Sequence, residues 1–162
     1  MTNKLCLKDA IITMMDNEKA LISFSMKYAD IYKNDAKAKK VFLNTVEFEN
    51  KHSSHFKKFL DGLNKDQCSY VIDMDSHSLL RIDPEVVGGY QKNELSVAEA
   101  IRTVEICEEK FVDAITGLKR VFGNDLKLDR LLEDEKTLLG EIFSYTQIGD
   151  GFKDLYLESE GP

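Results

Sequence analysis

The stretch EFENKHSSHF, residues 47–56, places a carboxylate and an imidazole on what is otherwise an apolar helix face. Phe48 and Phe56 mark that face, and Glu49 and His52 fall on it one helical turn apart. Burying both groups without partners is costly. We therefore expect ionisable side chains from elsewhere in the chain to face them. His55, about 60° further round the same helix, is expected to lie on the solvated flank.

The stretch belongs to one of four long segments whose apolar residues recur at alternating steps of three and four. This spacing is typical of helices that pack in a bundle. The expected helices span residues 5–33, 35–62, 96–122 and 125–148. Residues 64–95 instead mix short apolar runs with Asp, Pro and Gly-Gly, so we expect a long crossover with a short extended piece there.

Local start and stop residues support these helix limits. Asn34 or Asp35 can cap the second helix, and Gly62 can end it. Ser96 and Glu99 have the spacing of a capping box at the start of the third helix.

The order of the segments predicts the topology. A short turn makes two consecutive helices antiparallel neighbours, and a single long crossover is the connection found in ferritin-like bundles. We therefore expect one all-α domain over residues 1–162, a ferritin-like four-helix bundle of two antiparallel helix pairs.

The two halves of the chain also repeat weakly. A shift of 86 or 87 residues places Glu18 on Glu105 and Glu49 on Glu135. Each half thus has one glutamate on its first helix and another at a similar height on its second. Four inward carboxylates at one level repel one another unless cations lie between them. Two metal ions bridged by carboxylates meet this requirement.

Histidine completes the metal-binding pattern in one half only. Di-iron sites in helical bundles use Glu-x-x-His, whose spacing directs both side chains toward one centre. Glu49 and His52 form this motif, whereas Glu135 is followed by Leu138.

These residues give the chain a resemblance to the di-iron domain of the rubrerythrin branch of the ferritin-like superfamily, over roughly residues 5–150. Rubrerythrins carry an additional glutamate one turn beyond the ligand on the third helix, and Glu108 matches it. Val104 and Phe111 share the face of Glu108, so the periodicity also turns this residue inward. The ligand set that the resemblance implies is Glu18, Glu49, His52, Glu105, Glu108 and Glu135.

The chain departs from the family pattern at several places. Leu138 stands where the second histidine is expected, although ferritins also function with a single Glu-x-x-His. Rubrerythrins place tyrosines about two turns after the glutamates of helices one and three, where this chain has Ser25 and Val112. The rubredoxin domain that feeds electrons to complete rubrerythrins is absent from the sequence, which has no C-x-x-C pair.

The composition of the chain indicates which partners and which cellular compartment to expect. The chain is 43% hydrophobic and 31% charged, as in globular proteins, and its formal charge of −7 disfavours nucleic acids and anionic membranes as partners. No apolar run approaches the roughly 18 residues of a membrane span. The first residues lack the features of a signal peptide. Three scattered cysteines are expected to be reduced thiols, and the protein is expected to be cytoplasmic.

The resemblance implies a non-haem di-iron cofactor and redox chemistry on peroxide or dioxygen. It also implies an external electron donor and a homo-oligomer, taken as a dimer. Two alternatives stay open. One is a helical bundle with interior salt bridges or a degraded metal site, acting in assembly or partner binding; the other is an iron-storage shell. The sequence leaves open whether the protein is an enzyme.

Overall fold

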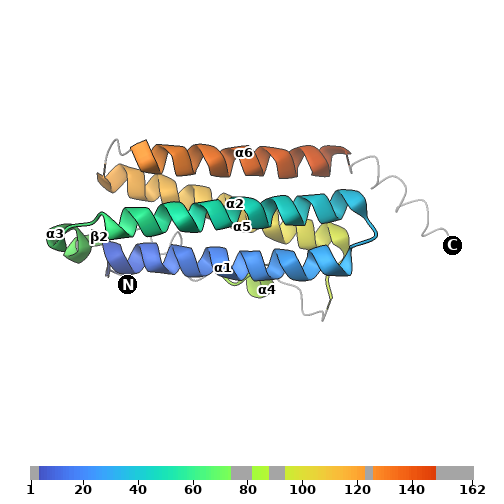
Figure 1. Cartoon of the computed structure of the whole chain (residues 1–162), viewed down its shortest axis with the longest axis horizontal. Helices are drawn as coiled ribbons and strands as arrows, with labels where there is room; N and C mark the ends of the chain where they lie inside the picture. The colour runs from blue at the N-terminus through green and yellow to red at the C-terminus, as the bar shows by residue number, and fades with distance from the viewer. Residues whose placement is uncertain (1–3, 74–81, 88–93, 123–125, 149–162) are drawn as a thin grey trace.

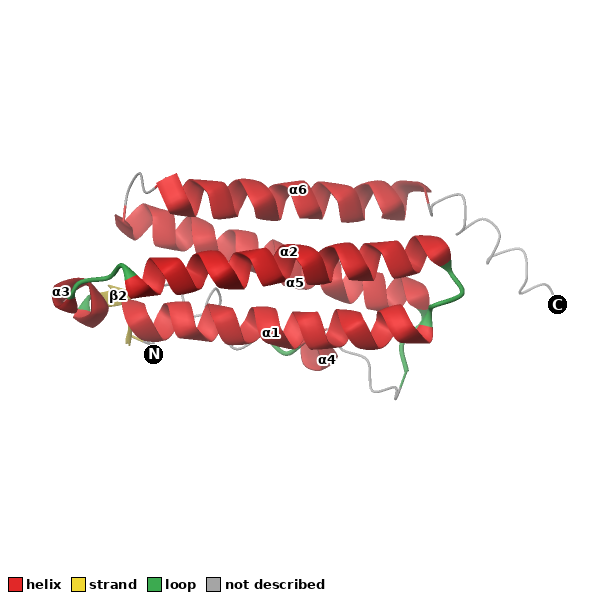
Figure 2. Ribbon diagram, in the orientation of Figure 1, coloured by secondary structure: helices red, strands yellow, loops and turns green. Residues whose placement is uncertain are grey.

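The structure is a computed structural model that describes residues 4–73, 82–87, 94–122 and 126–148. Four long helices dominate it (Figures 1 and 2). They are α1 (Leu7–Ile31), α2 (Ala36–Asp61), α5 (Val97–Phe122) and α6 (Leu126–Ile148). Each helix begins and ends within two residues of the range expected from the sequence, and the predicted helical class is confirmed.

The long helices lie side by side as two antiparallel pairs. α1 packs on α2, and α5 packs on α6. The colour gradient in Figure 1 shows that the members of each pair run in opposite directions, whereas α2 and α5 run in the same direction. α2 also contacts α6, and α1 contacts α5, so the four helices enclose a common interior.

Local side-chain chemistry sets the helix starts. Asp35 caps α2, where one carboxylate oxygen accepts hydrogen bonds from the backbone N–H groups of Lys37 and Ala38, each 3.0 Å long. At the start of α5 the Ser96 hydroxyl accepts from the Glu99 N–H, and the Glu99 carboxylate accepts from the Ser96 N–H. The predicted cap and capping box are therefore confirmed.

The connection between the two pairs contains short elements. These are α3 (Lys65–Ser69), β2 (Val71–Asp73) and α4 (Pro84–Val87). β2 is the extended piece expected there, and it pairs antiparallel with β1 (Lys4–Cys6), a strand that periodicity did not predict. Residues 74–81 and 88–93 of the expected crossover lie outside the described residues.

Side chains of α1 and of its C-cap residue, Tyr32, bind the described parts of the connection. The buried Asn17 accepts a 2.8 Å hydrogen bond from the backbone N–H of Ile82. Tyr28 accepts from the N–H of Leu95, and Tyr32 donates to its carbonyl. These bonds satisfy backbone groups that would otherwise be buried without partners.

Candidate metal centre

A cluster of ionisable side chains divides the interior into two apolar parts. On α6, Leu131 belongs to one apolar cluster and Leu138 to the other, and Glu135 lies between them. Glu18 separates the two clusters in the same way on α1. The ionisable residues, each at most 1% exposed, are Glu18, Glu49, His52, Glu108 and Glu135. All four long helices contribute to this cluster.

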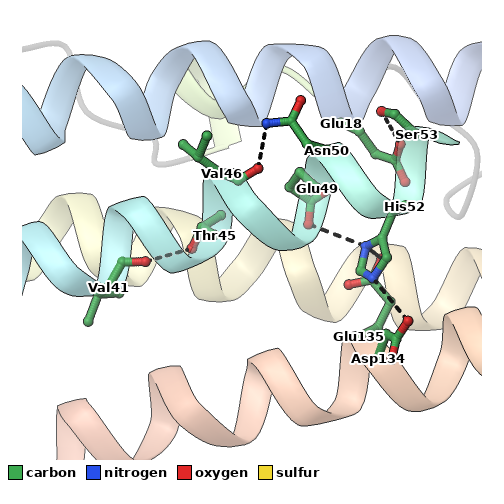
Figure 3. Close-up of polar contacts among 10 residues, drawn as sticks. All are labelled: Glu18, Val41, Thr45, Val46, Glu49, Asn50, His52, Ser53, Asp134 and Glu135. Atoms are coloured by element: carbon green, nitrogen blue, oxygen red, sulfur yellow. Dashed lines mark hydrogen bonds and ion pairs between the residues drawn. The ribbon is translucent and has the colours of Figure 1, made fainter.

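His52 lies at the centre of the contacts within the cluster (Figure 3). Its Nδ1 is 3.1 Å from Oε1 of Glu135 and 3.6 Å from Oε1 of Glu49. Its Nε2 faces the opposite way and is 4.0 Å from Oδ2 of Asp134, a partly exposed residue. Neither ring nitrogen is aligned for a hydrogen bond with any described residue. Because Nδ1 faces both Glu49 and Glu135, it is the ring nitrogen that could bind a cation together with these carboxylates.

Glu18 reaches the cluster from α1 and is held there by a hydroxyl group. Oγ of Ser53 donates a 2.8 Å hydrogen bond to Oε2 of Glu18 (Figure 3). One ligand atom each from Glu18, Glu49, His52 and Glu135 forms a group in which all four atoms lie within 4.8 Å of one another. The structure thus brings these predicted ligands together.

α5 contributes Glu108 to the cluster. Both of its carboxylate oxygens are buried and lack a hydrogen-bond partner among the described residues. Glu105, three residues earlier, instead forms an ion pair with the half-exposed Arg102. The structure does not bring Glu105 into the group around His52. His55 is only half-buried and also lies outside that group.

Burial raises the pKa of three carboxyl groups of the cluster, those of Glu18, Glu49 and Glu108. It raises the pKa of Glu49 to about 7, and the neighbouring charge of Glu135 adds to this shift. The pKa values of Glu18 and Glu108 are raised well above their usual range, first by burial and then by the charge of Glu49. Burial lowers the pKa of His52, but contacts with Glu135 and Glu49 outweigh it and raise the value to about 10.

The donor set fits a metal ion. The carboxylate oxygens of Glu49, Glu108 and Glu135 and both nitrogens of His52 are buried without hydrogen-bond partners among the described residues. Buried polar atoms without partners are rare in folded proteins. Carboxylate oxygen and imidazole nitrogen are the ligands that bind first-row transition metals such as iron. A cation at this point would compensate both the repulsion and the missing hydrogen bonds.

Leu138 lies one turn after Glu135 and is 1% exposed, within the apolar cluster that contains Leu21 and Ile142. It supplies no ligand atom. Among the described residues, only α2 supplies imidazole nitrogen to the centre, and described ligands for a second metal position beside Leu138 would be carboxylate oxygens.

Ser53 and Asp134 were not predicted from the sequence as neighbours of the site. A weak indication existed for Ser53. α1 ends at Ile31 and α2 begins at Ala36, which sets Glu18 level with Glu49 and places Ser53 about one helical turn from that level. Nothing in the sequence distinguishes Asp134 from the other acidic residues on the outer half of α6.

No described helix combines the length and the apolar character that a membrane span requires. Comparisons with protein-family models, with curated proteins and with solved structures find no match to this chain.

Proposed function

We propose that this protein is a ferritin-like helical bundle of the rubrerythrin type, whose Glu/His cluster holds a non-haem di-iron centre for redox chemistry on peroxide or dioxygen. The observation that carries the proposal is the buried group of Glu18, Glu49, His52 and Glu135, whose ligand atoms lie within 4.8 Å of one another. α2 and α5 run in the same direction, as a single long crossover between two antiparallel pairs requires, and this supports the ferritin-like arrangement.

Each residue of the cluster would have its own role in binding the metal. His52 would bind through Nδ1, the nitrogen that faces Glu49 and Glu135. These two carboxylates come from α2 and α6, which contact each other, and would be the bridging or paired ligands. Glu18 and Glu108 would complete the ligand set from α1 and α5. In this proposal Glu108 takes the role on α5 for which the sequence offered Glu105 as well.

The bound metal would supply electrons to an O–O bond, while the residues around it control charge and protons. Carboxyl groups with raised pKa values hold protons when the cation is absent and release them when it binds. The apolar clusters on both sides limit the access of water to the centre. A cytoplasmic location agrees with the free thiols of Cys6, Cys68 and Cys107, and an external electron donor and a homodimer remain part of the proposal.

The metal content of protein purified without added metal tests the proposal. We expect roughly one to two iron atoms per chain, because the clustered carboxylates need a counter-charge. The double variant Glu49→Ala/His52→Ala should lose this iron. A matched control, Glu47→Ala/His55→Ala, removes the same residue types from the same helix but outside the cluster, and it should keep the iron. Equal iron in both double variants would refute the assignment.

The competing function is a metal-free bundle that acts in assembly or partner binding. The specific observation in its favour is Leu138, together with the contacts that a protonated His52 can make with Glu49 and Glu135. It predicts no bound transition metal in the parent protein and no stabilisation by ferrous ion. The same metal analysis therefore separates the two functions.

A further inference from the structure

The hydroxyl group of Ser53 distinguishes Glu18 from the other carboxylates of the cluster. Ser53 Oγ donates to Oε2 of Glu18 across the α1–α2 interface, where Glu18 is 1% exposed. Within the part of the chain that the structure describes, the oxygens of Glu49, Glu108 and Glu135 receive no such bond. Glu18 is thus the cluster carboxylate whose orientation is fixed before any cation arrives.

The hydrogen bond restricts how Glu18 can act. The hydroxyl uses one lone pair of Oε2 and so fixes the direction of the carboxylate plane, while the remaining lone pairs of the group stay available to a cation. A neutral donor stabilises the carboxylate without neutralising the cluster, whereas a lysine or arginine in its place would supply the positive charge that a metal otherwise provides. Ser53 directly follows His52 on α2, so one short segment of helix orients a ligand from α1 and carries a ligand of its own.

The other half of the chain has no equivalent group. The 86-residue shift that relates Glu49 to Glu135 places Ser53 on Leu139, whose side chain has no hydrogen-bond donor. The repeat places Glu18 on Glu105, which pairs with Arg102 at the edge of the helix. The buried cluster carboxylates of Glu108 and Glu135 have no donor among the described side chains. The fixed orientation belongs to the His52 half of the centre.

From this asymmetry we propose that Ser53 is a positioning residue, which fixes the orientation of the Glu18 carboxylate and so preorganises the metal position on the His52 side. The inference rests on the proposed metal-binding function. A donor that orients a ligand typically changes metal affinity by about 10- to 100-fold when it is removed.

The test compares metal binding by the whole chain and three variants. Metal-free protein is titrated with Co²⁺, whose visible absorption reports the number and kind of its ligands. Ser53→Ala should weaken the tighter binding class by about tenfold or more and alter the Co²⁺ spectrum. Ser53→Thr retains the hydroxyl and should restore both affinity and spectrum. Ser54→Ala removes the exposed neighbouring hydroxyl and should leave both unchanged.

The controls separate positioning from a general structural effect. If Ser53→Ala does not fold, Ser53→Val matches the shape of Ser53→Thr without the hydroxyl and should bind Co²⁺ about tenfold or more weakly than Ser53→Thr. Normal binding by the parent together with equal affinity and an equal spectrum for a folded Ser53→Ala or Ser53→Val would overturn this inference alone. Failure of the parent to bind Co²⁺ or iron would overturn the proposed function and this inference with it.

Discussion

The metal-free protein should lose stability as the pH rises from about 5 to about 8, the opposite of the usual acid denaturation. The reason is that burial raises the pKa of Glu49 to about 7 from its ordinary value of 4.5. Between these two values the folded state holds a proton that the unfolded state has released. Raising the pH therefore favours the unfolded state over this range.

The shift in the pKa of Glu49 also determines how much stability is lost. A change in pKa from 4.5 to about 7 corresponds to about 3 kcal/mol in the free energy of unfolding. Glu18 and Glu108 act in the same direction, because their pKa values are also raised. The contribution of His52 is complete below its unfolded value of 6.5 and is lost as the pH approaches about 10.

Urea unfolding of chelator-treated protein, followed by far-ultraviolet circular dichroism at a series of pH values, measures this dependence. The variant Glu49→Gln removes this ionisation. Its free energy of unfolding should therefore equal that of the parent at about pH 5 and exceed it by about 3 kcal/mol at about pH 8. Glu47→Gln is the control. This exposed glutamate is on the same helix and pairs with Lys51, which lowers its pKa, so its replacement should not reduce the loss of stability between these pH values.

If the stability of the parent and of Glu49→Gln depends on pH in the same way, the reasoning is refuted. A Glu49→Gln protein that is less stable than the parent at about pH 8 would refute it too. Added metal supplies a second check. Because a cation binds the deprotonated carboxylates, saturating ferrous ion under anaerobic conditions should make the stability of the parent rise with pH over the same range.

Other expected outcomes concern Leu138, the two metal positions and Gly140. Leu138→His should lower the stability of the metal-free protein by about 1–3 kcal/mol. Added iron should then raise the melting temperature of this variant more than that of the parent or of a Leu138→Met control. An equal gain would mean that position 138 does not face the metals. Anaerobic titration of the parent with ferrous ion should show two affinity classes, the tighter on the His52 side, because imidazole is a strong neutral ligand; two equivalent sites would contradict this. Gly140 is exposed within α6 with no atom near its Cβ position, so Gly140→Ala should raise the free energy of unfolding by about 1 kcal/mol without changing metal content.

The helices were predictable because their start and stop residues act locally. Asp35 caps α2 through its own neighbours, and Ser96 and Glu99 bond each other within one turn. The connection was less predictable, because its contacts are distant in sequence. The pairing of β2 with β1 and the bond from Ile82 to Asn17 join segments far apart along the chain. Periodicity contains no information about such partners.

The site was predictable to within one helical turn. Glu49 and His52 were identified because their spacing and their apolar neighbours agree. On α5, Glu105 and Glu108 are one turn apart, and a modest rotation of the helix decides which of them faces inward. The structure buries Glu108 completely and leaves Glu105 8% exposed beside Arg102, a difference that depends on how α5 packs against the other helices.

The residue types in the cluster indicate whether it stabilises the fold or binds a ligand. Replacing buried ionisable groups by apolar ones of similar size is often neutral or stabilising. Leu138 shows that leucine fits beside Glu135, in the adjoining apolar cluster. A helical scaffold therefore gains little stability from Glu49, Glu108 and Glu135 beyond the contacts that the first and last make with His52. Their buried oxygens find no hydrogen-bond donor among the described residues. A cation that binds between them would turn this unfavourable cluster into a net source of stability, which is the physical reason to expect a metal here.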